Sequence, residues 1–354
     1  MYCKQCGARL VDDARFCHEC GAKVCEGETQ VQDLPAVQGP PVPWDDAPAV
    51  LDDAPAQGPS LVASTSTADK DAAPRPRRKG AVTVLFAILG ILLSVVGEVV
   101  GAVCAALFGA DMYLCGLVGS CVGAALGVCA MGGARLLDLR CSSVAAALRM
   151  GWWVIAVSLF LVANDAYGTI ASGAELRGDW FVRAWYALAL CACIGFSEET
   201  MFRGLLFGGL LDCWGKDHRG IVKAVLVSCL LFGAAHIEWW SVDYGDPAQL
   251  AQAVLKVVQT GMFGFLLAAM TLRTKSVIGP ALVHGLSNFV IFFYSYALMG
   301  EELDVSYVSS GVEGMETIVA YVAVIALYVP LVVKGIRMLR DAPVPDYGAF
   351  HSER

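Results

Sequence analysis

The chain has 354 residues, of which 57% are hydrophobic and only 16% charged, and its mean hydropathy is +0.60. Soluble domains carry about 25% charged residues, so this composition excludes an ordinary soluble protein and predicts a polytopic membrane protein with a soluble appendage. The net charge of −8 comes largely from residues 26–73, which hold nine acidic residues and one lysine. The remainder is nearly balanced, so no nucleic-acid partner is expected.

Two Cys-x-x-Cys pairs, each followed by glycine, open the chain at Cys3, Cys6, Cys17 and Cys20. The pattern resembles zinc-ribbon modules and predicts that residues 1–25 bind one structural Zn²⁺ through four thiolates. Four unrelated or redox cysteines are the alternative. A site of four thiolates has no open position for chemistry. No secretory signal precedes it, so we expect this module in the reducing cytosol, where it could bind a protein partner.

Residues 26–79 are rich in proline, alanine and aspartate and contain few large apolar residues. Such a segment buries too little apolar surface to offset its ordering entropy, so we expect a disordered linker. It ends in a basic cluster at Arg75, Arg77, Arg78 and Lys79, which favours contact with anionic lipid headgroups.

The rest of the chain contains long apolar segments, each near the ~20 residues that cross a bilayer. There are eight of them, at residues 81–108, 112–134, 150–169, 180–197, 220–237, 250–272, 277–299 and 316–336. The expected fold is therefore an all-α polytopic membrane protein, an eight-helix transmembrane bundle over residues 80–340, with a cytoplasmic tail at 341–354.

Lysine and arginine fall mainly on alternate loops between these segments, and the other loops are mainly acidic. By the positive-inside rule, both termini are expected in the cytoplasm and the protein in the plasma membrane. Arg177, Arg183 and Lys256 depart from this pattern.

The stretch from residue 180 to 214 is too long for one simple span. We expect a helix that breaks near Gly195, followed by a second helix that carries Glu198 to Leu211 near the cytoplasmic side. The alternative is a span that ends at Phe196, with both glutamates among the lipid headgroups.

Ionisable groups at membrane depth cost about 2.5–3.5 kcal/mol each on insertion scales, so they are usually buried, paired and functional. Glu199 and Arg203 are four residues apart, which places them on one helical face with the acid first, the favoured order. Glu198 lies about 100° around the helix. The spacing predicts that Arg203 holds Glu199 while Glu198 faces a cavity.

Two histidines lie within apolar spans, His236 in the sequence Phe232-Gly-Ala-Ala-His236 and His284 in His284-Gly-Leu-Ser-Asn288. Each shares a helical face with the residue four positions away. A glutamate can take a proton from water. Two imidazoles can bind a metal, or can position that water and stabilise an oxyanion, and an asparagine can donate to the oxyanion or orient a histidine. Histidines that merely pack and bond to neighbouring helices are the alternative.

Together, Glu-Glu-x-x-x-Arg at Glu198 to Arg203 and the two histidine motifs resemble the CPBP intramembrane proteases. This is the family of the type II CAAX prenyl endopeptidase, also called the Abi family. The resemblance covers about residues 150–300. It implies an eight-helix membrane bundle whose catalytic cavity opens to the cytosol.

The resemblance also implies roles for the individual residues. Glu198 would activate water, His236, His284 and Asn288 would complete the site, and Glu199 and Arg203 would support it. His236 and His284 could also hold a divalent active-site metal, and catalysis with or without metal stays open.

The sequence therefore predicts a metalloendopeptidase-like hydrolase that cleaves a peptide or membrane-protein substrate at the cytosolic side of the lipid bilayer. The alternative is a non-proteolytic scaffold or bacteriocin-immunity protein on the same fold. A transporter with a proton relay is weaker, because the two halves of the chain show no repeat.

Overall fold

The structure is a computed structural model of the chain, and it describes residues 80–302, 307–340 and 342. The four cysteines of the predicted zinc ribbon, the predicted linker and the tail after residue 342 lie outside the described residues. The described residues are helical, with no strand among them.

Three helices precede the segment that carries the two glutamates. They are α1 (Gly80–Phe108), α2 (Met112–Ala130) and α3 (Cys141–Ala171), with a short 3₁₀ turn, η1 (Ala134–Leu137), between the second and the third. The glycine-rich α2 packs along α1. Asp111 caps α2 by accepting a hydrogen bond from the Leu114 N–H, which satisfies one of the unpaired amides at a helix start.

Residues 180–214 form one continuous helical segment. It consists of α4 (Trp180–Glu199), the π-helix η2 (Thr200–Phe207) and α5 (Gly208–Trp214). The predicted break at Gly195 is therefore wrong, because α4 runs through this glycine. A Cβ at Gly195 would lie 2.5 Å from the Ala281 carbonyl oxygen and 2.8 Å from the Gly285 nitrogen. The glycine thus permits close helix packing, and the departure from α geometry comes after Glu199.

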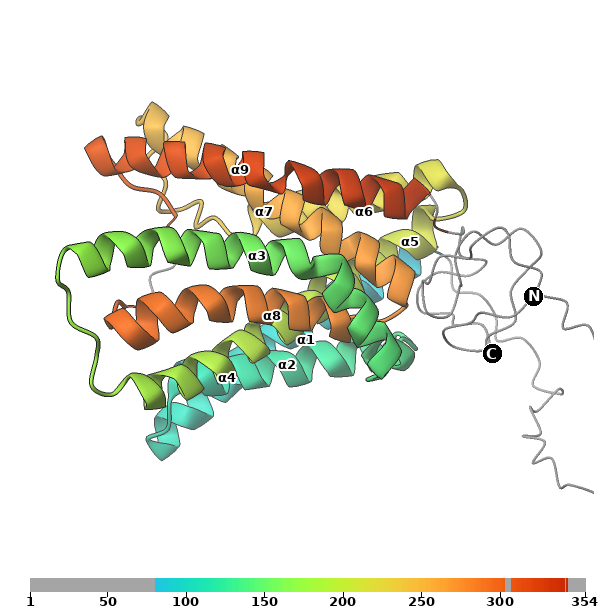
Figure 1. The fold of residues 1–354 in the computed structure, drawn as a ribbon. Helices are drawn as coiled ribbons and strands as arrows, with labels where there is room; N and C mark the ends of the chain where they lie inside the picture. Colours follow the sequence, from blue (N-terminus) through green and yellow to red (C-terminus); the bar gives the residue numbers. More distant parts are fainter. Residues whose placement is uncertain (1–79, 303–306, 341, 343–354) are drawn as a thin grey trace, which may run out of the picture. The chain divides into compact units, whose positions relative to one another are not determined.

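The remaining helices are α6 (His218–Ala234), α7 (Pro247–Thr274), α8 (Ile278–Phe292) with its π-helical continuation η3 (Phe293–Met299), and α9 (Gly311–Arg340). Figure 1 shows α6, α7 and α9 on one side of the bundle, α3 and α8 in the middle, and α2 and α4 on the other side. The central α8 packs against both α3 and α4, and α7 packs against α6 and α9.

Within the described residues, seven helical segments are long and apolar enough to cross a membrane. The expectation of a polytopic membrane protein is confirmed. All eight predicted segments coincide with helices, but the one predicted at 220–237 is the shorter α6, which has 17 residues and ends before His236. Large apolar side chains remain exposed along α1 and α9, as in helices that face lipid.

Candidate active site

Glu198 and Glu199 occupy the last turn of α4, immediately before the π-helix η2. They lie close to the midpoint of the 35-residue candidate span rather than near one of its ends. Short π-helical segments within α-helices are frequent at functional sites. The two carboxylates differ in burial, since 25% of the Glu198 side chain is exposed and none of the Glu199 side chain is.

The carboxylate of Glu198 faces both His236 and His284. Its Oε2 lies 3.6 Å from His236 Nε2 and 4.0 Å from His284 Nε2. Both separations exceed a direct hydrogen bond. Glu198 Oε2 is itself buried and has no hydrogen-bond partner among the described residues. Residues from α4, α8 and the turn after α6 therefore converge on a small gap.

The second nitrogen of each imidazole is held by the protein. His236 Nδ1 lies 2.8 Å from the Phe232 carbonyl oxygen, and His284 Nδ1 lies 2.9 Å from Glu199 Oε1. A carbonyl and a carboxylate can only accept, so both imidazoles donate from Nδ1. In the neutral form, each then presents an unprotonated Nε2 toward Glu198. Three acceptors meet at the gap, and a water molecule there could donate to two of them.

Glu199 forms a fully buried ion pair. Its Oε1 accepts from Arg203 Nη1 at 3.0 Å as well as from His284, and both Glu199 and Arg203 are at most 1% exposed. The guanidinium carbon of Arg203 lies 3.9 Å above the centre of the Phe232 ring. The pairing predicted from the i, i+4 spacing is present, and it extends to His284, which the spacing could not show.

Aromatic rings enclose the two imidazoles. The Phe232 ring lies edge-on 4.6 Å from that of His236, and the Phe263 ring on α7 lies 5.0 Å from that of His284. A Cβ at Gly264 would lie 2.7 Å from Arg203 Nη2 and 2.8 Å from the Phe232 ring. The glycine on α7 therefore makes room for both side chains.

Asn288 lies one turn beyond His284 on α8 and is half-buried. In the described part of the chain, no hydrogen bond joins it to Glu198, His236 or His284. The structure brings five of the six predicted site residues within 4.0 Å of one another in a chain of contacts, whereas Asn288 only shares α8 with His284.

The donor types at the gap, two imidazole nitrogens and a carboxylate oxygen, are those that zinc accepts. However, the residues that the structure describes contain no group of three or more histidine, cysteine, aspartate or glutamate residues positioned to hold a metal ion. The placement does not fit the predicted active-site metal, so the chemistry below is derived from the side chains alone.

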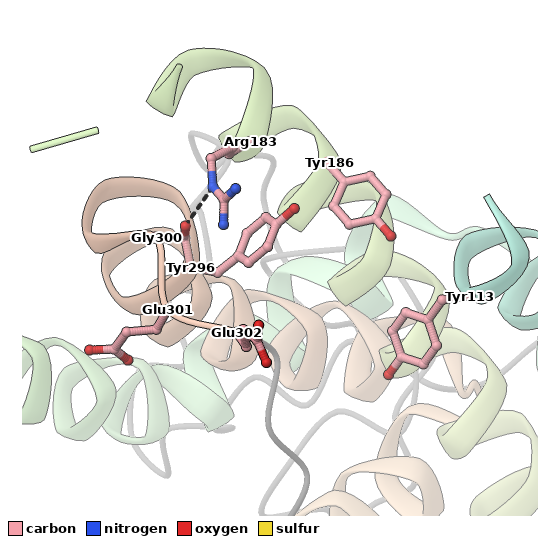
Figure 2. Close-up of a pocket in the computed structure, with 7 residues that line it drawn as sticks. All are labelled: Tyr113, Arg183, Tyr186, Tyr296, Gly300, Glu301 and Glu302. Atoms are coloured by element: carbon pink, nitrogen blue, oxygen red, sulfur yellow. Dashed lines mark hydrogen bonds between the residues drawn. The ribbon is translucent and has the colours of Figure 1, made fainter. Parts of the chain in front are cut away.

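A separate cavity of about 580 Å³ lies between α2, α4, η3 and the residues that follow η3. Figure 2 shows it lined by aromatic, cationic and acidic side chains: Tyr113, Arg183, Tyr186, Tyr296, Gly300, Glu301 and Glu302. Arg183 donates from Nε to the Tyr296 carbonyl at 2.9 Å, and its guanidinium covers the Tyr296 ring at 3.9 Å. The cavity shares no residue with the Glu198 cluster.

Residues 180–290 match the family model described as type II CAAX prenyl endopeptidase Rce1-like. This segment is therefore similar to that domain, and the match covers less than half of the chain. The segment contains Glu198, Glu199, Arg203, His236 and His284, and it also includes Asn288. Residues 2–24 match the zinc-ribbon domain model. No curated protein and no solved structure matches the chain.

The Rce1-like match thus begins with α4 and ends within α8, and the helices α1 to α3 and α9 lie outside it. The resemblance seen in the three motifs is confirmed, and so is the zinc-ribbon family of the N-terminus. The match supports a function like that of a type II CAAX endopeptidase.

Sequence reasoning missed two contributors to the site. Phe263 belongs to no motif, and only its packing reveals its contact with His284. The Phe232 carbonyl, which fixes the His236 tautomer, could not be predicted either, because a sequence motif does not show backbone hydrogen bonds.

Proposed function

We propose that the chain is an intramembrane endopeptidase that hydrolyses a peptide bond with a water molecule activated by Glu198. The observation that carries the proposal is the convergence of the Glu198 carboxylate with the Nε2 atoms of His236 and His284, at 3.6 and 4.0 Å. A carboxylate beside two imidazole acceptors can orient one water molecule through both of its hydrogens.

In the proposed reaction, the water donates one hydrogen to Glu198 and the other to an imidazole Nε2. Glu198 then removes its proton as the water oxygen attacks the carbonyl carbon of the substrate. The carbonyl oxygen becomes an oxyanion, and the carboxamide of Asn288 is the group that we assign to donate to it. The C–N bond breaks as Glu198 returns the proton to the leaving nitrogen, so one water is consumed for each bond cleaved.

Glu199 and Arg203 are assigned a positioning role. Glu199 keeps the His284 proton on Nδ1, so the other nitrogen faces the water. Arg203 neutralises Glu199, which would otherwise be an unpaired charge in the bundle.

Access of the peptide from the cytosolic side is part of the proposal and is supported by the distribution of basic loops. Reporter fusions at the two termini should both report the cytoplasm. A reporter at either terminus that reads the opposite side would overturn the assigned orientation.

The test of catalysis compares membranes that hold wild-type protein with membranes that hold Glu198→Gln, which preserves the shape of the side chain. Peptide termini that appear only with the wild type are expected, because loss of a general base lowers rates about 10²–10⁴-fold. If a phenotype caused by deletion is instead fully rescued by Glu198→Gln, the chain acts as a non-proteolytic scaffold.

A further inference from the structure

Lys256 lies at membrane depth on α7, inside a candidate span, and is half-buried. Its Nζ lies 3.9 Å from the centre of the Tyr307 ring and 5.9 Å from that of Tyr321 on α9. An ammonium group is costly in this setting unless it has a partner or a function. Within the described part of the chain, its closest partners are these two rings, and it forms no ion pair there.

Hydrogen bonds hold the two tyrosine rings that lie against Lys256, those of Tyr307 and Tyr321, in place. Gln252, one turn earlier on α7, donates to the Ser309 carbonyl and accepts from the Ser309 N–H, both at 2.8 Å. The Tyr321 hydroxyl donates to the Tyr307 carbonyl at 2.9 Å. These bonds hold the segment that carries Tyr307 against α7 and α9. Rings attract the cation, but they leave its three N–H donors available for an anion.

Lys256 is adjacent to the catalytic cluster. The next residue, Val257, packs against Gly233, where an added Cβ would meet the Val257 carbonyl. Val257 and Tyr307 both pack against the apolar cluster that contains Ile237, the neighbour of His236.

The spacing along α7 gives the approximate separation between Lys256 and the part of the helix that contacts His284. Phe263, which touches His284, follows Lys256 by seven residues, or about 10 Å of helix. An extended peptide covers this distance in a few residues, at about 3.3 Å each. A substrate whose scissile bond lies at Glu198 could therefore place a nearby negative group at the ammonium.

We propose that Lys256, held on Tyr307 and Tyr321, is a specificity-determining residue that binds a carboxylate of the peptide substrate a few residues from the scissile bond. The inference rests on the proposed function, since it assumes that a peptide occupies the Glu198 site. A peptide carries carboxylates at its C-terminus and on aspartate and glutamate side chains. The chemistry at Lys256 is the same for both sources.

The test uses an internally quenched peptide library with one prenylated cysteine, prepared with either a C-terminal carboxylate or a C-terminal carboxamide. Lys256→Met should lower kcat/KM for the acid library about 10- to 100-fold, the range for a hydrogen bond to a charged group. It should leave unchanged an amide-terminated library that contains no aspartate or glutamate, and Lys256→Arg should retain most of the wild-type activity on the acid library. Lys223→Met is the matched control, because Lys223 also lies over an aromatic ring, that of Trp214 at 4.1 Å, but is exposed on α6.

A second pair of amide-terminated libraries distinguishes the source of the carboxylate. One contains aspartate and glutamate, and the other contains asparagine and glutamine in their place. A Lys256→Met effect confined to the first of these libraries assigns the ammonium to a substrate side chain. Equal losses on acid and amide peptides of every kind would overturn the proposal and make Lys256 a counter-charge for Glu198.

A peptide-binding measurement distinguishes failure of this inference from failure of the proposed function. The same peptides are titrated against Glu198→Gln protein in lipid nanodiscs, with and without Lys256→Met. If peptides with a carboxylate bind more tightly and Lys256→Met abolishes this difference, the proposed role of Lys256 is supported. This holds even if the wild type hydrolyses none of the peptides, and in that case only the proposed catalytic function fails. Equal binding of acid and amide forms of both library pairs overturns the role of Lys256 whether or not hydrolysis occurs.

Discussion

Glu199 Oε1 lies 2.9 Å from His284 Nδ1, so a carboxylate on α4 fixes the tautomer of an imidazole on α8. The same oxygen accepts from Arg203 on η2. One buried atom therefore joins three helical segments, and its removal should affect both stability and the proposed chemistry.

Glu199→Gln should destabilise the bundle, because it leaves the buried guanidinium of Arg203 without its counter-charge. Breaking a buried pair from one side costs about 3–5 kcal/mol. The measurement is the thermal midpoint of the purified protein in detergent. Activity should fall as well, because a carboxamide can hydrogen-bond either His284 tautomer. An unchanged midpoint would show that the pair contributes little.

Gly264→Ala should lower stability by about 1–3 kcal/mol, the usual range for overpacking. The new methyl group would meet Arg203 Nη2 and the Phe232 ring at 2.7 and 2.8 Å. Gly261→Ala on the same helix is the control, since its methyl group would meet the Cys229 carbonyl at an ordinary 3.4 Å. Similar midpoints for the two variants would contradict the packing described at Gly264.

Gly195→Ala should reduce activity more than an added methyl group elsewhere, because its contacts are backbone atoms of α8 that cannot rotate away. The substitution would push α4 from α8 and so separate Glu198 and Glu199 from His284. Gly168→Ala on α3 is the comparison, because nothing lies within 4 Å of its added methyl group. The initial rate of peptide hydrolysis reports the difference, and equal rates would refute it.

The zinc ribbon is predicted to bind one Zn²⁺ per chain through Cys3, Cys6, Cys17 and Cys20, which metal analysis of the purified protein can count. Replacing Cys6 and Cys17 with serine should abolish this zinc. Removing residues 1–25 should leave the membrane domain folded in detergent. Loss of the folded bundle after this truncation would argue against independent domains.

The apolar segments and the three motifs were sufficient to predict the helices and to bring Glu198, Glu199, Arg203 and the two histidines together. Helical spacing alone predicted the Glu199–Arg203 pair. The break expected at Gly195 was wrong, since a glycine in an apolar helix can equally mark the close approach of another helix. Phe263 could not be predicted, because its role arises from packing between α7 and α8 and not from local sequence.

The short length of α6 bears on how water, the second reactant of the proposed hydrolysis, reaches Glu198. Its 17 residues span about 25 Å, less than the ~30 Å thickness of the hydrocarbon layer. His236 follows the end of this helix, and the exposed Glu238, Ser241 and Asp243 come directly after it. A helix shorter than the hydrocarbon layer is matched by local thinning of the bilayer, so we expect hydrated headgroups near the end of α6 that precedes His236. We therefore expect the length of this one helix to help water reach Glu198, whose side chain is 25% exposed, whereas Glu199 and Arg203 are buried.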